Sequence, residues 1–171
     1  MTAINEVMVE KIVINMGVGS DEGKMKKAVQ VMNTIAGKSG VKTTSKLRIP
    51  DWGVRPGVEL GLKLTLRKKA ANEFLKKALV AKENKIPAKS FDKEGNFGFG
   101  IKEHINVPGV KYDPKIGIMG FDVLVALKKK GYRIKYRKIK QATVGRKQRV
   151  SREEAIEFVK TLGVEIIWVK Q

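Results

Sequence analysis

The sequence contains no cysteine, and it has a single histidine, His104. The missing thiols exclude disulfides and thiolate-bound zinc, and one imidazole leaves little basis for histidine-based catalysis or a metal site. We therefore expect a protein with no cofactor, no metal and no catalytic residue.

Long hydrophobic runs are also missing. Apolar stretches such as FDVLVAL (Phe121 to Leu127) fall far short of the roughly 20 residues that a membrane-spanning helix needs. The first twenty residues include Asn5, Glu6, Glu10 and Lys11, which interrupt any signal-peptide core. These features predict a cytoplasmic protein.

Acidic residues are few beside basic ones. The chain has 17 Asp+Glu against 36 Lys+Arg, which gives a formal net charge of +19. Such a field attracts polyanions, and it opposes folding through self-repulsion when nothing neutralises it. A hydrophobic content of 42% over 171 residues is enough for one domain with a proper core. Nucleic acid is therefore the first candidate partner, and an anionic membrane surface is the second.

The segment IVINMGVGSDEGKM (Ile12 to Met25) has the layout of a phosphate-binding loop, but its spacing does not fit. A Walker loop would need glycine where Val18 stands and a hydroxyl where Met25 stands. The dinucleotide pattern G-x-G-x-x-G fails as well, because its third glycine, Gly23, comes one residue late. We favour a tight turn from a strand into a capped helix.

Hydrophobic periodicity divides the chain into strands and helices. The predicted strands are 7–16, 41–45, 60–67 and 121–127, the last apolar nearly throughout and so expected to be buried on both faces. The predicted helices are 24–36, 71–79 and 151–163, and 164–169 could add a closing strand. Because strands and helices mix without regular alternation, we expect an α+β fold with helices packed on one face of the sheet.

LGLKLTLR (Leu60 to Arg67) is the clearest strand. Its leucines point to one face, and Lys63, Thr65 and Arg67 point to the other. Such a row can bond phosphate or ribose, but the solvated outer face of a sheet looks similar.

A long loop, KLRIPDWGVRPGVE (Lys46 to Glu59), separates two of the strands and carries Arg48, Trp52 and Arg55. Long ordered loops in compact domains tend to be functional. Here the indole can stack on a base while the arginines hold phosphate, or Trp52 can fold back to cap the core. The glycines of FGFG (Phe97 to Gly100) indicate close strand packing more readily than base stacking.

The segment 128–150 is rich in Lys and Arg and contains no acidic residue. Within it, tyrosine and isoleucine alternate with cations, which predicts an extended basic arm with one apolar face and one cationic face, ordered by its partner. The cationic positions are Arg133, Lys135 and Arg137.

Four motifs occur together in a characteristic order and spacing: INMGVG, RPGVELGLKLTLR, KSFDKEGNFGFGIKE and YDPKIGIMGFDV. Over residues 6–127 the chain thereby resembles the large-subunit ribosomal protein L-five family. Its start close to the first strand and its basic arm resemble the archaeal branch.

The resemblance implies a single domain over 1–171, with a concave antiparallel sheet backed by helices, the basic arm at 128–150 and a terminal helix at 151–163. It implies a structural constituent of the large ribosomal subunit, located in the cytoplasm, that binds 5S rRNA in the central protuberance. Further implied partners are large-subunit rRNA, the peptidyl-site tRNA, and neighbouring ribosomal proteins of the central protuberance and of the small-subunit head.

The family motifs place the implied contacts on this chain. The expected rRNA-binding residues are Asn15, Gly17, Lys42, Thr44, Lys63, Thr65 and Arg67, to which the charge of the arm adds Arg133, Lys135 and Arg137. The expected tRNA-binding residues are Lys46, Arg48, Trp52 and Arg55. Residues 112–115 match the segment near the bridge to the small subunit.

Two other functions fit a basic surface. An RNA-modifying or RNA-cleaving enzyme would use it to capture substrate, but the chain offers no paired-carboxylate motif in a glycine-lined pocket. A peripheral membrane binder would need an apolar stripe opposite a basic one on a helix, whereas the basic run here has a period of two. We therefore expect a structural RNA-binding protein that is not an enzyme and binds no membrane.

Overall fold

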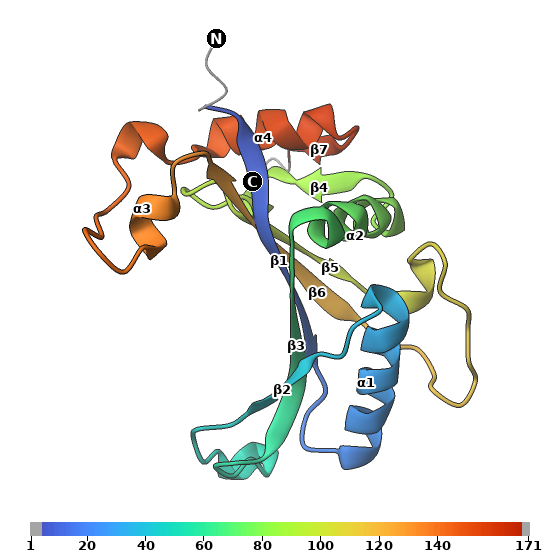
Figure 1. Ribbon diagram of the computed structural model, residues 1–171. Coiled ribbons are helices and arrows are strands. Elements are labelled where there is room, and N and C mark those ends of the chain that lie inside the picture. The colour runs from blue at the N-terminus through green and yellow to red at the C-terminus, as the bar shows by residue number, and fades with distance from the viewer. Residues whose placement is uncertain (1–4, 169–171) are drawn as a thin grey trace.

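A computed structural model describes residues 5–168. Its centre is a five-stranded antiparallel sheet in the order β2-β3-β1-β6-β5, with α1 and α2 on one face (Figure 1). The α+β prediction is thus confirmed. The strands are β1 Val7–Gly17, β2 Val41–Thr44, β3 Glu59–Arg67, β4 Lys85–Pro87, β5 Phe97–Ile101, β6 Phe121–Lys129 and β7 Glu165–Ile167. The α-helices are α1 Glu22–Ala36, α2 Lys68–Ala81, α3 Arg133–Tyr136 and α4 Arg152–Thr161.

The core lies between the sheet and the two helices. Ile14 of β1 is directly opposite Leu64 of β3, and both are buried. The helices close this layer with residues at helical spacing, such as Met25 and Met32 of α1 and Leu75 of α2. The leucine face predicted for residues 60–67 is therefore the core face.

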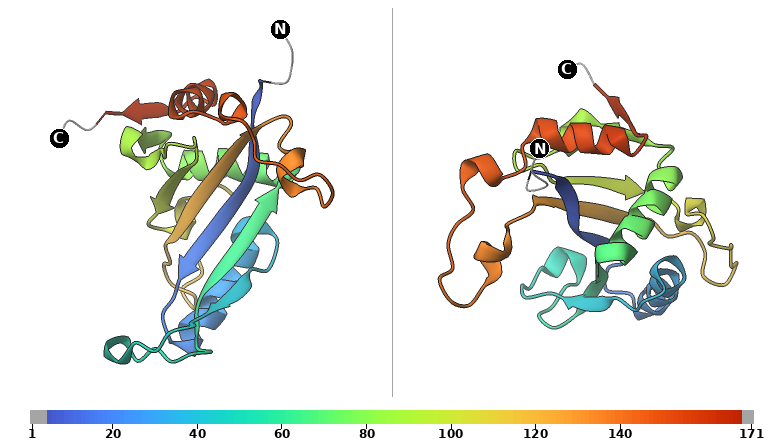
Figure 2. Two further views of the ribbon diagram at one scale, coloured as in Figure 1. Left: turned by 90° about the vertical axis from the view of Figure 1, so that its left-hand side faces the viewer. Right: turned by 45° about the horizontal axis from the view of Figure 1, so that its top comes forward.

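Neither α1 nor α2 covers the other face of the sheet, which we call the open face; the segment 130–150 with the short helix α3 overhangs one end of it. Figure 2 shows it turned toward the viewer, with the loop 45–58 projecting at one end and the segment 130–150 at the other. These two projections lie at opposite ends of the open face.

Strand β6 differs from its prediction. Its residues alternate between buried and exposed along Phe121–Lys129, and Leu124 is 49% exposed on the open face. The apolar run indicated burial on both faces, but helices cover only one side of the sheet. A side chain at Gly98 of β5 would meet Leu124, since an added Cβ would lie 2.8 Å from Leu124 Cδ2. The rings of Phe97 and Phe99 point into the core, so these glycines serve packing, as the sequence favoured.

The turn between β1 and α1 is the capped turn that the sequence favoured. The Asp21 carboxylate accepts hydrogen bonds from the amides of Gly23 at 2.8 Å and Lys24 at 3.2 Å. The helix ends at Gly37, which has a left-handed φ of 64°. The amides that would hold a phosphate are thus bonded to the chain's own carboxylate.

The basic segment does not form the extended arm that its alternation indicated. Strand β6 runs to Lys129, Gly131 takes a φ of 99°, and one helical turn, α3, follows. The Ala142 amide donates to the Ile134 carbonyl, and the Tyr136 hydroxyl donates to the Glu10 carboxylate at 2.8 Å. These contacts within the chain hold a compact loop. Tertiary contacts therefore override the strand preference that a short alternation of apolar and cationic residues indicated.

The C-terminal region packs across one end of the sheet. Ser151 and Glu154 form the predicted capping box at the start of α4. The predicted closing strand is β7, which pairs in parallel with β4 in a separate small sheet; Val169, the last residue of that prediction, lies outside the described residues.

The Lys129 ammonium, on a residue only 4% exposed, contacts the Glu154 carboxylate at 2.7 Å. Partial burial tends to raise the pKa of Glu154, but hydrogen bonds from Lys129 and Ser151 outweigh burial, so the pKa lies below its ordinary value. This ion pair ties β6 to α4.

Candidate nucleic-acid interface

The predicted row of polar side chains lies on the open face. Lys63, Thr65 and Arg67 of β3 are all exposed, while the leucines between them are buried. Across the sheet, Asn15 of β1 is directly opposite Lys63, and Lys11 is opposite Arg67. Donors for phosphate and ribose therefore line two adjacent strands.

The charge of this face is not neutralised from within. Among residues 5–168, Lys11, Lys63 and Arg67 take part in no salt bridge. Lys11 and Arg67 stand directly opposite each other, an arrangement of like charges that destabilises a sheet. Asp122 of β6 stands opposite Asn15, so the Lys11 end of the face is the more positive one.

Strand β2 places its predicted contacts elsewhere. Lys42 is opposite the buried Leu62, on the helix side of the sheet, and its ammonium contacts the Glu59 carboxylate at 2.8 Å. Thr44 follows a register shift and is opposite Glu59, outside the regular row. Lys42 and Thr44 thus lie apart from the row of Lys63, Thr65 and Arg67, and their contact with RNA stays a prediction. The short stretch VKTTS has no apolar alternation to fix its register, and a shift of one residue exchanges the two faces.

The glycines near Gly17 permit a close approach of two strands. Gly17 is exposed and stands opposite Gly61. A Cβ added at Gly61 would lie 2.5 Å from the Met16 carbonyl oxygen, whereas one added at Gly17 would meet nothing within 4 Å. The amides of Val18 and Gly19 both donate to the Leu60 carbonyl. The close approach of the two strands therefore requires glycine at position 61. Contact of Asn15 and Gly17 with RNA stays a prediction.

The loop 45–58 is held by its own backbone. Ile49 and Val54 pair with each other, and a single 3-10 turn, Pro50–Trp52, forms the tip. Trp52 is 74% exposed, so the alternative that it caps the core is wrong. The side chains of Lys46, Arg48 and Arg55 are exposed as well. The loop thus exposes an indole and three cations, groups that can stack on a base and bond phosphate.

The three cations assigned to the basic arm do not share one face. Lys135 points into a cavity, the Arg137 guanidinium bonds the Lys140 carbonyl, and Arg133 begins α3 with its side chain exposed. The structure leaves their contact with RNA as a prediction.

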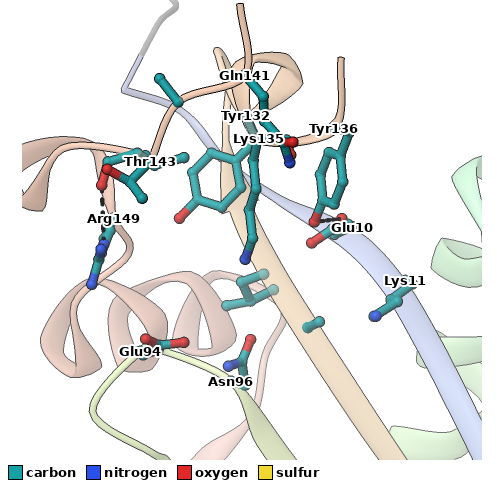
Figure 3. A pocket seen from close by; sticks show the side chains of 14 residues that line it. Glu10, Lys11, Glu94, Asn96, Tyr132, Lys135, Tyr136, Gln141, Thr143 and Arg149 are labelled. Atoms are coloured by element: carbon teal, nitrogen blue, oxygen red, sulfur yellow. Dashed lines mark hydrogen bonds between the residues drawn. The ribbon is translucent and has the colours of Figure 1, made fainter. Parts of the chain in front are cut away.

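A cavity between the segment 130–150 and the open face is a feature that the sequence reading missed (Figure 3). It has a volume of about 680 Å³. Its walls carry the rings of Tyr132 and Tyr136 and, across the gap, the polar side chains of Glu94 and Asn96. The hydrogen bond to Glu10 raises the pKa of the Tyr136 hydroxyl. No local motif marks this site, because its walls come from β1, the turn before β5, the end of β6 and the segment 130–150.

His104 lies in the interior of the fold. His104 is buried, and its Nδ1 accepts a hydrogen bond from the Met119 amide at 3.3 Å. Within residues 5–168 no cluster of three or more His, Asp or Glu side chains is placed to hold a metal ion. No helix in that same range has the length and apolar character to cross a membrane.

Comparison with known proteins connects the two halves of the chain to one family. Residues 3–55 match the family model described as Ribosomal protein L5, and residues 59–158 match the model for the C-terminus of the same ribosomal family. A Large ribosomal subunit protein uL5 of Pyrobaculum aerophilum is 44% identical over 95% of this chain and 92% of its own length. The uL5 of Nanoarchaeum equitans is 42% identical, over 96% of this chain and 98% of its own length. The uL5 of Archaeoglobus fulgidus is 44% identical over 94% of this chain and 90% of its own length.

Proposed function

Because this chain belongs to the ribosomal protein L5 family, we propose that it binds 5S rRNA through the open face of its sheet, within the central protuberance of the large subunit. As a ribosomal protein it is a structural component in the cytoplasm rather than an enzyme. The observation that carries the proposal is the row of exposed Lys63, Thr65 and Arg67 beside Lys11, whose cations form no salt bridge within residues 5–168.

The chemistry of the row suits a folded RNA. The A-form major groove is too narrow for side chains to read, so recognition rests on shape, phosphates and 2′-hydroxyls. Lysine and arginine bond phosphate, while the hydroxyl of Thr65 and the amide of Asn15 bond ribose and backbone. The opposition of Lys11 and Arg67 costs the free protein stability, and a phosphate between them would remove the repulsion.

The loop 45–58 is proposed to contact the peptidyl-site tRNA. It projects from the end of the sheet opposite α3, and its exposed Trp52 sits near Arg48 and Arg55 in sequence. Residues 112–115, also exposed, are proposed to lie near the small-subunit head. Large-subunit rRNA and neighbouring ribosomal proteins of the central protuberance would complete the surroundings.

A gel-shift titration with 5S rRNA tests the open face. Lys63→Glu and Arg67→Glu are each expected to weaken binding strongly, and each lost phosphate contact should lower the salt slope by about one, by analogy with duplex nucleic acid. Lys77→Glu, on the exposed side of α2, makes the same charge change on the far side of the sheet and serves as the control.

Two outcomes would overturn the assignment. If Lys77→Glu weakens binding as much as Lys63→Glu, net charge rather than the open face governs affinity. If neither open-face variant differs from the wild type at any salt concentration, the sheet does not bind the RNA. The enzyme alternative would instead predict cleaved or modified 5S rRNA after incubation with pure protein.

A further inference from the structure

The cavity beneath α3 has the size and the walls of a binding site. Its volume of about 680 Å³ lies within the range of about 300–1,000 Å³ that small-molecule sites occupy. Figure 3 shows the Tyr132 ring and the Lys135 ammonium directed into the space from one side, with Glu94 and Asn96 facing them from the other.

One wall offers aromatic rings and positive charge. The Lys135 ammonium lies 6.0 Å from the centre of the Tyr136 ring, whose hydroxyl is already bonded to Glu10. The Tyr132 side chain, by contrast, makes no hydrogen bond within residues 5–168, and its ring is partly exposed to the cavity. Aromatic faces next to cations are the usual platform for an unstacked nucleobase.

The facing wall offers acceptors. Glu94 makes no side-chain hydrogen bond within the described part of the chain, although its amide helps to form the turn with Asp92. The Asn96 side-chain amide donates to the Asp92 carboxylate at 3.0 Å, which leaves its carbonyl oxygen to accept. The turn thus holds a carboxylate and an amide oxygen toward the ring of Tyr132 across the cavity.

We propose that this cavity takes one unstacked guanine of the bound RNA, an inference that rests on the proposed function. Guanine presents two adjacent donors, N1–H and the N2 amino group, on its Watson–Crick edge, and the Glu94 carboxylate accepts both in parallel. Adenine presents an acceptor beside a donor there, so a carboxylate leaves one contact unmade. Tyr132 covers the face of the base, and Lys11 and Lys135 hold its phosphates.

The position of the cavity indicates a nucleotide within a strand rather than a free one. Lys11 lines the cavity and is also the residue opposite Arg67, at the end of the row Lys63, Thr65, Arg67. Tyr136, on the aromatic wall, bonds the carboxylate of Glu10, the residue next to Lys11. A backbone that follows the row therefore arrives at the mouth of the cavity.

Nuclear magnetic resonance titrations of the full chain with GMP, AMP and inorganic phosphate test the base preference. GMP is expected to shift the amide signals of Glu94 and Asn96 and to bind about tenfold more tightly than AMP, because one charge-assisted hydrogen bond separates them. Glu94→Gln should abolish the preference, since a glutamine amide can pair with N1 and the N6 amino group of adenine or with O6 and N1–H of guanine. Glu73→Gln, an exposed acid on α2, is the matched control and should change nothing.

The proposal fails if phosphate alone reproduces the shifts of GMP, if GMP and AMP bind equally, or if no nucleotide shifts these signals at millimolar concentration. The first result would leave only a cationic surface, and the second would remove the role of Glu94.

Binding of 5S rRNA separates this failure from failure of the proposed function. Tyr132→Leu should weaken the complex about tenfold by removing one stacking platform. If Tyr132→Leu and Glu94→Gln bind like the wild type while Lys63→Glu does not, the cavity proposal is wrong and the open face stands. If Lys63→Glu and Arg67→Glu also bind normally, the proposed function itself is wrong.

Discussion

The two faces of β1 and β3 are built from alternate residues of the same short segments, yet they differ in every physical respect. On the covered face, Ile14 and Leu64 meet under the helices and are almost fully buried. On the open face, the adjacent residues Asn15 and Lys63 stand directly opposite each other, and neither α1 nor α2 covers them. The covered face accounts for the stability of the fold, so the composition of the open face is free to follow a ligand.

The largest expected effect comes from truncating a side chain on the covered face. Leu64→Ala should lower the free energy of unfolding by about 2–5 kcal/mol, because it opens a cavity beneath the helices. Urea denaturation followed by circular dichroism measures the change.

Thr65→Ala, one residue away on the open face, is the control and should change stability by no more than about 0.5 kcal/mol. A loss at Thr65 equal to that at Leu64 would erase the distinction between the faces.

Lys129 sharpens the comparison, because it is a cation buried on the covered side. Glu154→Gln keeps the capping box, which accepts glutamine, but removes the charge that faces Lys129. We expect the free energy of unfolding to fall by about 1–3 kcal/mol. This is less than the loss for a fully buried ion pair, because the Glu154 side chain is 39% exposed. Glu153→Gln, an exposed acid in the same turn, should cost much less.

The same variant has a defined pH dependence. The Glu154 pKa is depressed in the folded protein, so the pair contributes fully above the ordinary value of 4.5 and loses its contribution as the pH falls through the folded pKa. The stability gap between wild type and Glu154→Gln should therefore shrink below about pH 4.5. A gap that stays constant down to acid denaturation would show that the charge is not the cause.

Lys11→Thr should produce a smaller change of opposite sign. It removes the repulsion across from Arg67 and should raise the free energy of unfolding by about 0.2–1 kcal/mol, while weakening 5S rRNA binding. Because salt screens exposed charges, the gain should decline at high ionic strength. A variant that loses both stability and affinity would contradict the view that the open face is shaped for a ligand.

Trp52→Ala should have the smallest effect on stability, within about 0.5 kcal/mol, since the indole is exposed. We expect 5S rRNA binding to stay intact and tRNA-dependent steps of translation to slow, as measured with reconstituted subunits. Unfolding of this variant would show that the loop supports the core after all.

The buried faces of the strands and helices could be predicted from the sequence wherever a hydrophobic period repeats over many residues. The leucines of β3 and the stripes of α1 and α2 specify one buried face through many residues, so single exceptions do not matter. The capping box of α4 was equally legible, because its two side chains are local.

The misses share a different physical cause. An apolar run such as β6 does not say whether one face or two will be covered, since that depends on where distant helices pack. The register of β2 and the folded path around Tyr136 depend on partners elsewhere in the chain, Glu59 and Glu10. The cavity lies beside the Tyr136–Glu10 contact and is lined by residues far apart in the chain, so it became visible only in three dimensions.

The central position of β1 has a consequence for synthesis. Its two neighbours are β3, residues 59–67, and β6, residues 121–129, so β1 leaves the ribosome long before one of the two strands that flank it. Until residues 121–129 have emerged, β1 keeps an unpaired edge, and closure of the sheet must bring together residues more than a hundred positions apart. A nascent chain this rich in positive charge would meet ribosomal RNA before its own last core strand existed.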